Sequence, residues 1–149
     1  MDLFEEFSAL LDAIHDADLS YAVVGALAVA IYGAPRATTD IDLLVSPEDV
    51  ERFREVAKAR GFGLEALPFT FSDGMELRRL TKVSGGDTLT LDLLLVNPNL
   101  ESVWNSRTWT ETDFGKVSVI SLDALVKMKT LAGRSRDLSD VERLLENDR

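Results

Sequence analysis

Hydrophobic residues recur along the chain at two spacings, and each spacing predicts a different kind of element. Apolar side chains fall three or four residues apart over residues 3–17, which predicts an amphipathic helix with an acidic opposite side. The same spacing predicts helices over residues 47–60 and 121–132 and at the end of the chain. Tyr21–Val24 and Asp40–Val45 are short, mostly apolar runs, which predict strands.

The middle of the chain predicts a hairpin. Residues 75–83 and 88–96 are two strand-like runs joined by Ser84-Gly85-Gly86-Asp87, a typical turn sequence. Residues 62–74 fit either a strand or a packed loop, and residues 109–120 predict a further strand or hairpin. Strands mixed with helices in a chain of 149 residues predict a single domain of the α/β (α+β) class with one core.

The stretch Gly25–Val45 carries the strongest chemical signal. Gly25 follows directly on the first apolar strand, and residues 26–32 predict a helix. Asp40 and Asp42 point to the same face of the next strand, because strand side chains alternate between faces. Two neighbouring carboxylates on an apolar strand repel each other and resist desolvation, and a divalent cation relieves both costs. The alternative is a solvated pair without a metal.

This stretch resembles the signature of the nucleotidyltransferase superfamily, whose fold is that of DNA polymerase beta. The signature is an apolar residue, Gly, then Gly or Ser, a spacer, and Asp-apolar-Asp or Glu-apolar. Here it reads Val24-Gly25-Ala26, a spacer over residues 27–39, and Asp40-Ile41-Asp42-Leu43. The lead-in Arg36-Ala37-Thr38-Thr39 resembles the short bacterial branch that includes toxin-type and antitoxin-type nucleotidyltransferases.

Ala26 departs from that signature, because the family has Gly or Ser at this position. The resemblance implies that a Ser hydroxyl to the nucleotide phosphates is missing here. Backbone N–H groups of Gly25 and Ala26, at the start of a helix, are then the expected phosphate ligands.

Asp92 is the third candidate carboxylate. It is the one charge inside the apolar run Leu89–Val96, and a lone Asp in a central strand costs free energy unless it is paired or bound to a metal. The resemblance implies that Asp92 is the third metal ligand after Asp40 and Asp42, since the family places such a carboxylate on a later strand. The alternative is a tilted strand on which Asp92 meets solvent.

Two basic residues are candidate phosphate contacts, Arg36 and Lys129. At 100° per residue Lys129 falls inside the apolar arc of its predicted helix, whereas Lys127 lies outside it. Lys129-Thr130-Leu131-Ala132 followed by Arg134 resembles a run of the toxin-like branch, which implies that Lys129 reaches a triphosphate. The alternative is a Lys129 stem that merely runs along the core.

The last helix is open to two interpretations. Arg136-Asp137-Leu138-Ser139-Asp140 resembles the closing Arg-Asp-x-x-Asp of the same branch. In the structural interpretation Asp137 or Ser139 caps the helix, and four apolar residues pack inward. These are Leu138, Val141, Leu144 and Leu145.

Composition limits the class of protein. Apolar residues make up 46% of the chain, as in folded globular domains. The absence of cysteine excludes disulfides and a thiolate nucleophile, and it fits a reducing cytoplasm. No apolar run approaches the roughly 20 residues that span a bilayer, and the acidic N-terminus is not a signal peptide. We therefore expect a cytoplasmic protein without a membrane partner.

The resemblance implies an acceptor molecule for the transferred nucleotide, and the net charge of −10 predicts the class of that acceptor. Long nucleic acids are bound through many Lys and Arg contacts, and the basic residues here are few and scattered. The acceptor is therefore expected to be a small hydroxylated molecule, a partner protein's side chain or at most an RNA end such as that of a tRNA.

The sequence thus predicts a nucleotidyltransferase fold, a small mixed sheet with helices mainly on one face. The resemblance implies transfer of a nucleoside monophosphate from an NTP to a hydroxyl, with Mg²⁺ or Mn²⁺ as cofactor. Asp40, Asp42 and Asp92 are the expected catalytic and metal-binding residues. The alternative function is a non-catalytic module that binds a nucleotide or a partner, such as an antitoxin, and Ala26 is the feature that supports it.

Overall fold

The computed structural model describes residues 1–34, 38–113 and 115–147, which form helices and an eight-stranded sheet. The helices are α1 (Leu3–Asp16), α2 (Gly25–Ile31), α3 (Val50–Ala59), α4 (Glu101–Asn105), α5 (Leu122–Ala132) and α6 (Ser135–Asn147), with 3₁₀ turns η1 (Pro47–Asp49) and η2 (Pro98–Leu100). The strands are β1 (Tyr21–Val24), β2 (Asp40–Val45), β3 (Leu64–Glu65), β4 (Phe69–Thr70), β5 (Glu76–Ser84), β6 (Asp87–Leu95), β7 (Thr108–Thr112) and β8 (Gly115–Val119).

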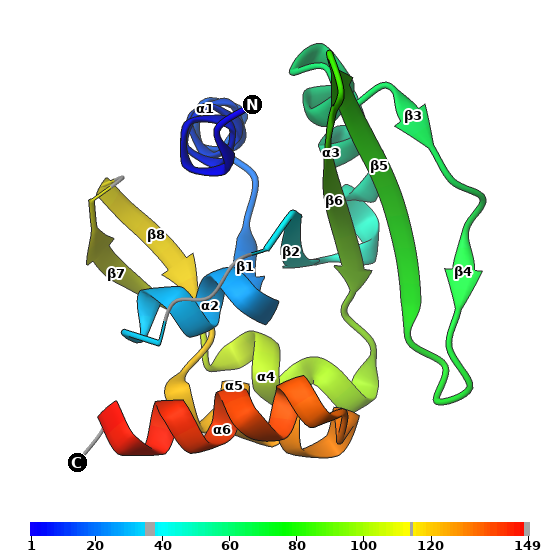
Figure 1. Ribbon diagram of the computed structural model, residues 1–149. Helices are drawn as coiled ribbons and strands as arrows, with labels where there is room; N and C mark the ends of the chain where they lie inside the picture. The colour runs from blue at the N-terminus through cyan, green and yellow to red at the C-terminus, as the bar shows by residue number, and fades with distance from the viewer. Residues whose placement is uncertain (35–37, 114, 148–149) are drawn as a thin grey trace.

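The sheet is mixed, and its middle strands are those that carry the predicted acids (Figure 1). Its order is β3-β5-β6-β2-β1-β8-β7, and β4 also pairs with β5. β2 is parallel to β6 and antiparallel to β1, whereas β5 and β6 form the predicted antiparallel hairpin. This is the α/β class and the mixed sheet that the sequence predicts.

The core lies between the middle strands and the helices. Phe7, Leu10 and Ile14 of α1 and Phe53 of α3 are buried with Leu43 of β2 in one continuous cluster. Figure 1 shows α1 and α3 at one end of the molecule and α5 and α6 at the other, with α2 beside β1 and β2. Within the described residues, none of the helices has both the length and the apolar character that a membrane crossing requires.

Two helix starts differ in the way they are capped. Ser121 accepts a hydrogen bond from the N–H of Ala124 at 3.1 Å, and Gly133 ends α5 in the left-handed region at φ +67°. Ser46 stands in the same position before the predicted helix over residues 47–60. Its side chain makes no such bond, and the chain first forms the 3₁₀ turn η1 before α3.

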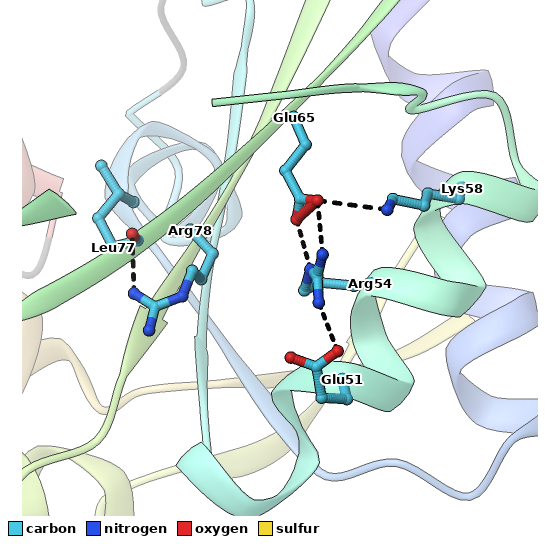
Figure 2. A network of polar contacts seen from close by, with 6 residues as sticks. All are labelled: Glu51, Arg54, Lys58, Glu65, Leu77 and Arg78. Carbon is cyan, nitrogen blue, oxygen red and sulfur yellow. Dashed lines mark hydrogen bonds and ion pairs between the residues drawn. The ribbon is translucent and has the colours of Figure 1, made fainter. Parts of the chain in front are cut away.

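Residues 62–74 form two strands of two residues each, β3 and β4, at the edge of the sheet. Phe62 is buried but Leu67 is 89% exposed. Figure 2 shows how β3 is tied to α3: Arg54 donates to both carboxylate oxygens of Glu65, and Lys58 lies 3.2 Å from the same carboxylate. Such exposed ion pairs contribute little to stability, so they fix the position of β3 rather than hold the fold together.

The inward face of α6 differs from the prediction. Leu138 and Leu145 were expected to pack inward but are 48% and 45% exposed. The residues that do face the core are Asp137, Asp140 and Leu144. The physical reason is Lys129 of α5, whose buried ammonium is paired with both of these acids.

A core truncation tests this packing. Leu43→Ala in β2 removes a side chain that is fully buried, so we expect a loss of about 2–5 kcal/mol in the free energy of unfolding. Leu67→Ala is the matched control and should change it by less than about 0.5 kcal/mol. Urea unfolding measures both, and equal effects would contradict the described core.

Candidate functional site

Three charged side chains form a row across the middle of the sheet. The parallel pairing of β2 with β6 places Asp42 opposite Asp92, and the antiparallel pairing of β6 with β5 places Arg79 opposite Asp92. Residues that are paired across strands share a face of the sheet. The side chains of Asp42, Asp92 and Arg79 therefore lie side by side, in that order.

Asp92 is held by a two-pronged ion pair. Arg79 donates from Nε to Oδ1 at 2.8 Å and from Nη2 to Oδ2 at 2.9 Å. Asp92 is only 7% exposed, so the sequence-based alternative of a strand tilted into solvent is wrong. These hydrogen bonds, and after them the charges of Asp92, Asp40 and Asp42, hold the pKa of Arg79 above its usual range.

Asp42 lies in an environment that disfavours its charge. Burial is the largest cause, followed by the negative charges of Asp92 and Asp40 and by a hydrogen bond with Asp92, and together they raise the pKa of Asp42 to about 7. The positive charge of Lys129 acts in the opposite direction. Asp42 and Asp92 thus lie close together, and near neutral pH Asp42 carries a proton for part of the time.

Gly25 is required by the position of Asp42. Its φ is +67°, and a Cβ built there would lie 2.2 Å from Oδ2 of Asp42. Only a residue without a side chain allows α2 to begin so close to this carboxylate. Ala26, the next residue, is buried, and no side chain caps the start of α2. The predicted role of both N–H groups in phosphate binding stays a prediction.

Asp40 lies two residues before Asp42 and so on the same face of β2. It is half-buried, and its N–H donates to Oγ1 of Thr38 at 3.1 Å. Its charge contributes to the raised pKa of Asp42. Arg36, the other predicted phosphate contact, lies outside the described residues.

Lys129 is buried, as its place on the helical wheel predicts, and it is already paired. Its Nζ lies 3.1 Å from Oδ1 of Asp137 and 3.3 Å from Oδ2 of Asp140, both on α6. Arg134 also donates to Asp137 at 2.6 Å. Burial raises the pKa of Asp137, but the hydrogen bonds from Arg134 and Lys129 outweigh it and hold that pKa below its ordinary value. The phosphate contact of Lys129 stays a prediction.

The carboxylates of Asp42 and Asp92 are chemically suitable ligands for a divalent cation, but they are not arranged around a ready-made metal position. Among the described residues, no group of three or more His, Cys, Asp or Glu side chains is arranged to hold a metal ion as it stands. Mg²⁺ usually takes one or two carboxylates, with water and substrate phosphates as its other ligands. Asp42 and Asp92, which contact each other and repel, are such a pair.

The cavity lined by His15, Tyr21 and Trp109, of about 480 Å³, lies elsewhere. Tyr21 begins β1, whereas the acids lie beyond its other end, where Val24 pairs with Asp42. Nε2 of His15 and the Tyr21 hydroxyl are hydrogen-bonded at 2.8 Å. The single histidine is therefore not a part of the carboxylate row, the name used here for Asp40, Asp42 and Asp92.

Arg79 is the site residue that the sequence-based prediction missed. In the sequence it is one of several basic residues that are scattered along the chain. The signal was nevertheless present, because the hairpin turn at Gly85-Gly86 sets the register of β5 and β6. Counting outward from that turn places Arg79 opposite Asp92.

No family model matches the sequence, and no curated protein matches it. Solved structures are similar in fold. A candidate nucleotidyltransferase from Thermotoga maritima, TM1012, is 16% identical with a TM-score of 0.66, over 98% of this chain and 93% of that one. The antibiotic-resistance factor ANT(2'')-Ia is 15% identical with a TM-score of 0.65, over 97% and 84%.

ANT(2'')-Ia has also been solved in complex with adenylyl-2''-tobramycin. That structure is 14% identical with a TM-score of 0.63, over 93% of this chain and 84% of that one. At these identities the similarity shows the fold alone. The chain has the nucleotidyltransferase fold, as predicted, and these structures do not assign it to the toxin-type or antitoxin-type branch.

The close contact at Gly25 can be tested by adding a methyl group. Gly25→Ala should cost roughly 1–2 kcal/mol for its positive φ and about 1–3 kcal/mol more for the overlap with Asp42. Gly85→Ala is the matched control, because its φ is +60° and nothing lies within 4 Å of the added Cβ. The excess should largely disappear in an Asp42→Ala background. Equal costs at Gly25 and Gly85 would show that the contact is not tight.

The raised pKa of Asp42 predicts a pH dependence of stability. Between about pH 4 and pH 7 the folded chain binds a proton at Asp42 that the unfolded chain has lost. The free energy of unfolding of the metal-free protein should therefore fall as the pH rises through this range, by roughly 1–4 kcal/mol from this group. Asp42→Asn should remove this contribution. Urea titrations at a series of pH values in chelator measure it, and identical slopes for both proteins would refute it.

Proposed function

We propose that this chain transfers a nucleoside monophosphate from an NTP to the hydroxyl of an acceptor and releases pyrophosphate. The observation that carries the proposal is the contact between Asp42 and Asp92 on neighbouring parallel strands, beside a glycine that has no room for a side chain. The fold supports it, because ANT(2'')-Ia, which shares the fold, has been solved in complex with adenylyl-2''-tobramycin.

Mg²⁺ or Mn²⁺ is the proposed cofactor, held by Asp40, Asp42 and Asp92. When bound, the cation neutralises negative charge on the triphosphate and makes the acceptor hydroxyl more acidic. The carboxylate row is suited to hold it, because a cation relieves the repulsion that raises the pKa of Asp42.

The proposed transfer forms a bond from the acceptor oxygen to the α-phosphorus of the NTP. The bond between that phosphorus and the oxygen bridging to the β-phosphate breaks, and pyrophosphate leaves with the electron pair. Asp92 is the proposed acceptor of the hydroxyl proton. Backbone N–H groups of Gly25 and Ala26 are the proposed phosphate ligands, with Arg36 and Lys129 as further contacts that supply positive charge.

As a phosphate contact, Lys129 would have to interact with the phosphates while it stays paired with Asp137 and Asp140. Its ammonium has three N–H donors, and Asp137 and Asp140 lie near it on α6. Its effect on the pKa of Asp42 means that its charge is already felt at the carboxylate row. We therefore propose that Lys129 acts on the phosphates through its charge.

The proposed acceptor is compact: a small hydroxylated molecule, a partner protein's side chain or an RNA end. The net charge of −10 opposes tight binding to a long polyanion. Among compact acceptors it favours a cationic one, since opposite charge accelerates encounter. A non-catalytic binding module is the other interpretation, and it rests on Ala26 alone.

Labelled substrates test the proposal directly. The protein is incubated with each α-labelled NTP, Mg²⁺ or Mn²⁺, and a panel of hydroxylated small molecules, RNA ends and cell extract. Label should move to one acceptor class, and pyrophosphate should appear in equal amount. Asp42→Asn and Asp92→Asn should lower the rate by roughly 10²-fold or more.

The exposed Asp12→Asn is the control for the loss of one negative charge and should keep the full rate. Thermal unfolding adds a readout that needs no acceptor. Mn²⁺ with NTP should raise the Tm of the wild type and of Asp12→Asn, and should raise that of Asp42→Asn much less. Equal shifts in all three proteins, together with no transfer of label, would refute the proposed function.

A further inference from the structure

Arg79 is half in solvent and half in the carboxylate row. Its side chain is 49% exposed, whereas the side chain of Asp92 is only 9% exposed. A guanidinium has five N–H donors in a fixed plane, and two of them are used on Asp92. This pairing is geometrically specific, because both prongs need the carboxylate in one orientation.

The order of the strands decides which side of Asp92 is covered. β6 lies between β2 and β5, so Asp92 has Asp42 on one side and Arg79 on the other. A carboxylate offers about four acceptor positions, and the guanidinium occupies two of them from the β5 side. The positions toward Asp42, which lies opposite Asp92 on β2, are left for another ligand.

We propose that Arg79 is a positioning residue: it holds the Asp92 carboxylate from behind, so that the edge facing Asp42 is preset to bind a divalent cation. This inference rests on the proposed function, since it takes Asp92 to be a metal ligand. Carboxylates that bind metals are commonly fixed in this way by a hydrogen-bonding partner outside the metal's own shell. Arg79 stays on Asp92 when the cation binds.

The opposite role for Arg79 makes a different prediction. If Arg79 were only a stand-in charge that must leave before the cation enters, its removal would strengthen cation binding. If it positions Asp92, its removal weakens binding even though a positive charge near the site is lost. The direction of the change therefore separates the two roles.

Binding of Mn²⁺ alone, without NTP or acceptor, is the test. We measure the Kd by the loss of the free Mn²⁺ spin-resonance signal and by titration calorimetry. Arg79→Gln should weaken binding by about 10–100-fold. Arg79→Lys keeps the positive charge but cannot make the two-pronged pairing with Asp92, so it should weaken Mn²⁺ binding by several-fold. The stand-in role predicts no loss of Mn²⁺ affinity in this variant. In an Asp92→Asn background, Arg79→Gln should add little.

Arg78→Gln is the matched control. Arg78 is the residue before Arg79 in β5 and therefore points to the opposite face, where it lies 3.6 Å from Glu76. Figure 2 shows the hydrogen bond that it donates to the carbonyl oxygen of Leu77, at 3.2 Å. It should keep the wild-type Kd. If Arg79→Gln fails to fold by circular dichroism, Arg79→Lys carries the test.

The outcomes separate this inference from the proposed function. If the wild type binds Mn²⁺ and Asp92→Asn weakens it, but Arg79→Gln and Arg79→Lys bind as tightly as the wild type or more tightly, the positioning role of Arg79 is refuted and the metal site stands. If the wild type binds no Mn²⁺, or Asp92→Asn leaves the Kd unchanged, both are refuted. An equal loss in Arg78→Gln would also overturn the positioning role.

Discussion

The parallel pairing of β2 with β6 brings two carboxylates into contact in the middle of the sheet, and the surrounding structure compensates for that contact. Asp42 and Asp92 are placed opposite each other by the strand register, not by flexible loops, so neither backbone can move away from the repulsion. Arg79 on the neighbouring strand neutralises one carboxylate. A raised pKa keeps a proton on the other for part of the time near neutral pH.

The helix that follows β1 is constrained by the same contact. α2 begins at Gly25 with its backbone against Asp42, which explains why an apolar strand is followed at once by glycine. A bulkier residue would force either α2 or the carboxylate to shift. The close approach of helix start to carboxylate is also what the proposed function needs, because the phosphates of a nucleotide must lie near both.

Much of the fold could be predicted because local patterns and global packing agree in this chain. The apolar runs at Tyr21–Val24 and Asp40–Val45 are strands, and the Gly85-Gly86 turn joins β5 to β6. The alternation of side chains also placed Asp40 and Asp42 on one face. What the sequence did not reveal is the order of the strands in the sheet, since pairing between distant strands leaves no short-range signal. The direct neighbourhood of Asp42 and Asp92 depends on that order.

The last helix shows why pattern alone failed at one place. Leu138 and Leu145 have the spacing of a buried face, but burial of Lys129 on α5 requires acids opposite it. Asp137 and Asp140 therefore turn inward, and the leucines stay exposed. The free energy of leaving a buried ammonium unpaired exceeds what two partly buried leucines would gain. A charge on one helix thus decided the orientation of the next.

The balance of charge in the row supports the proposed divalent cation. Asp40, Asp42 and Asp92 bring three negative charges to one face, and Arg79 returns one positive charge. The charge of Lys129 also reaches Asp42, but it is balanced by Asp137 and Asp140, which lie against its ammonium. Two negative charges are therefore left when all three acids are ionised, and the proton on Asp42 is a partial remedy that fails as the pH rises. One divalent cation supplies the missing charge without a proton, and it would leave the Arg79 pairing with Asp92 intact.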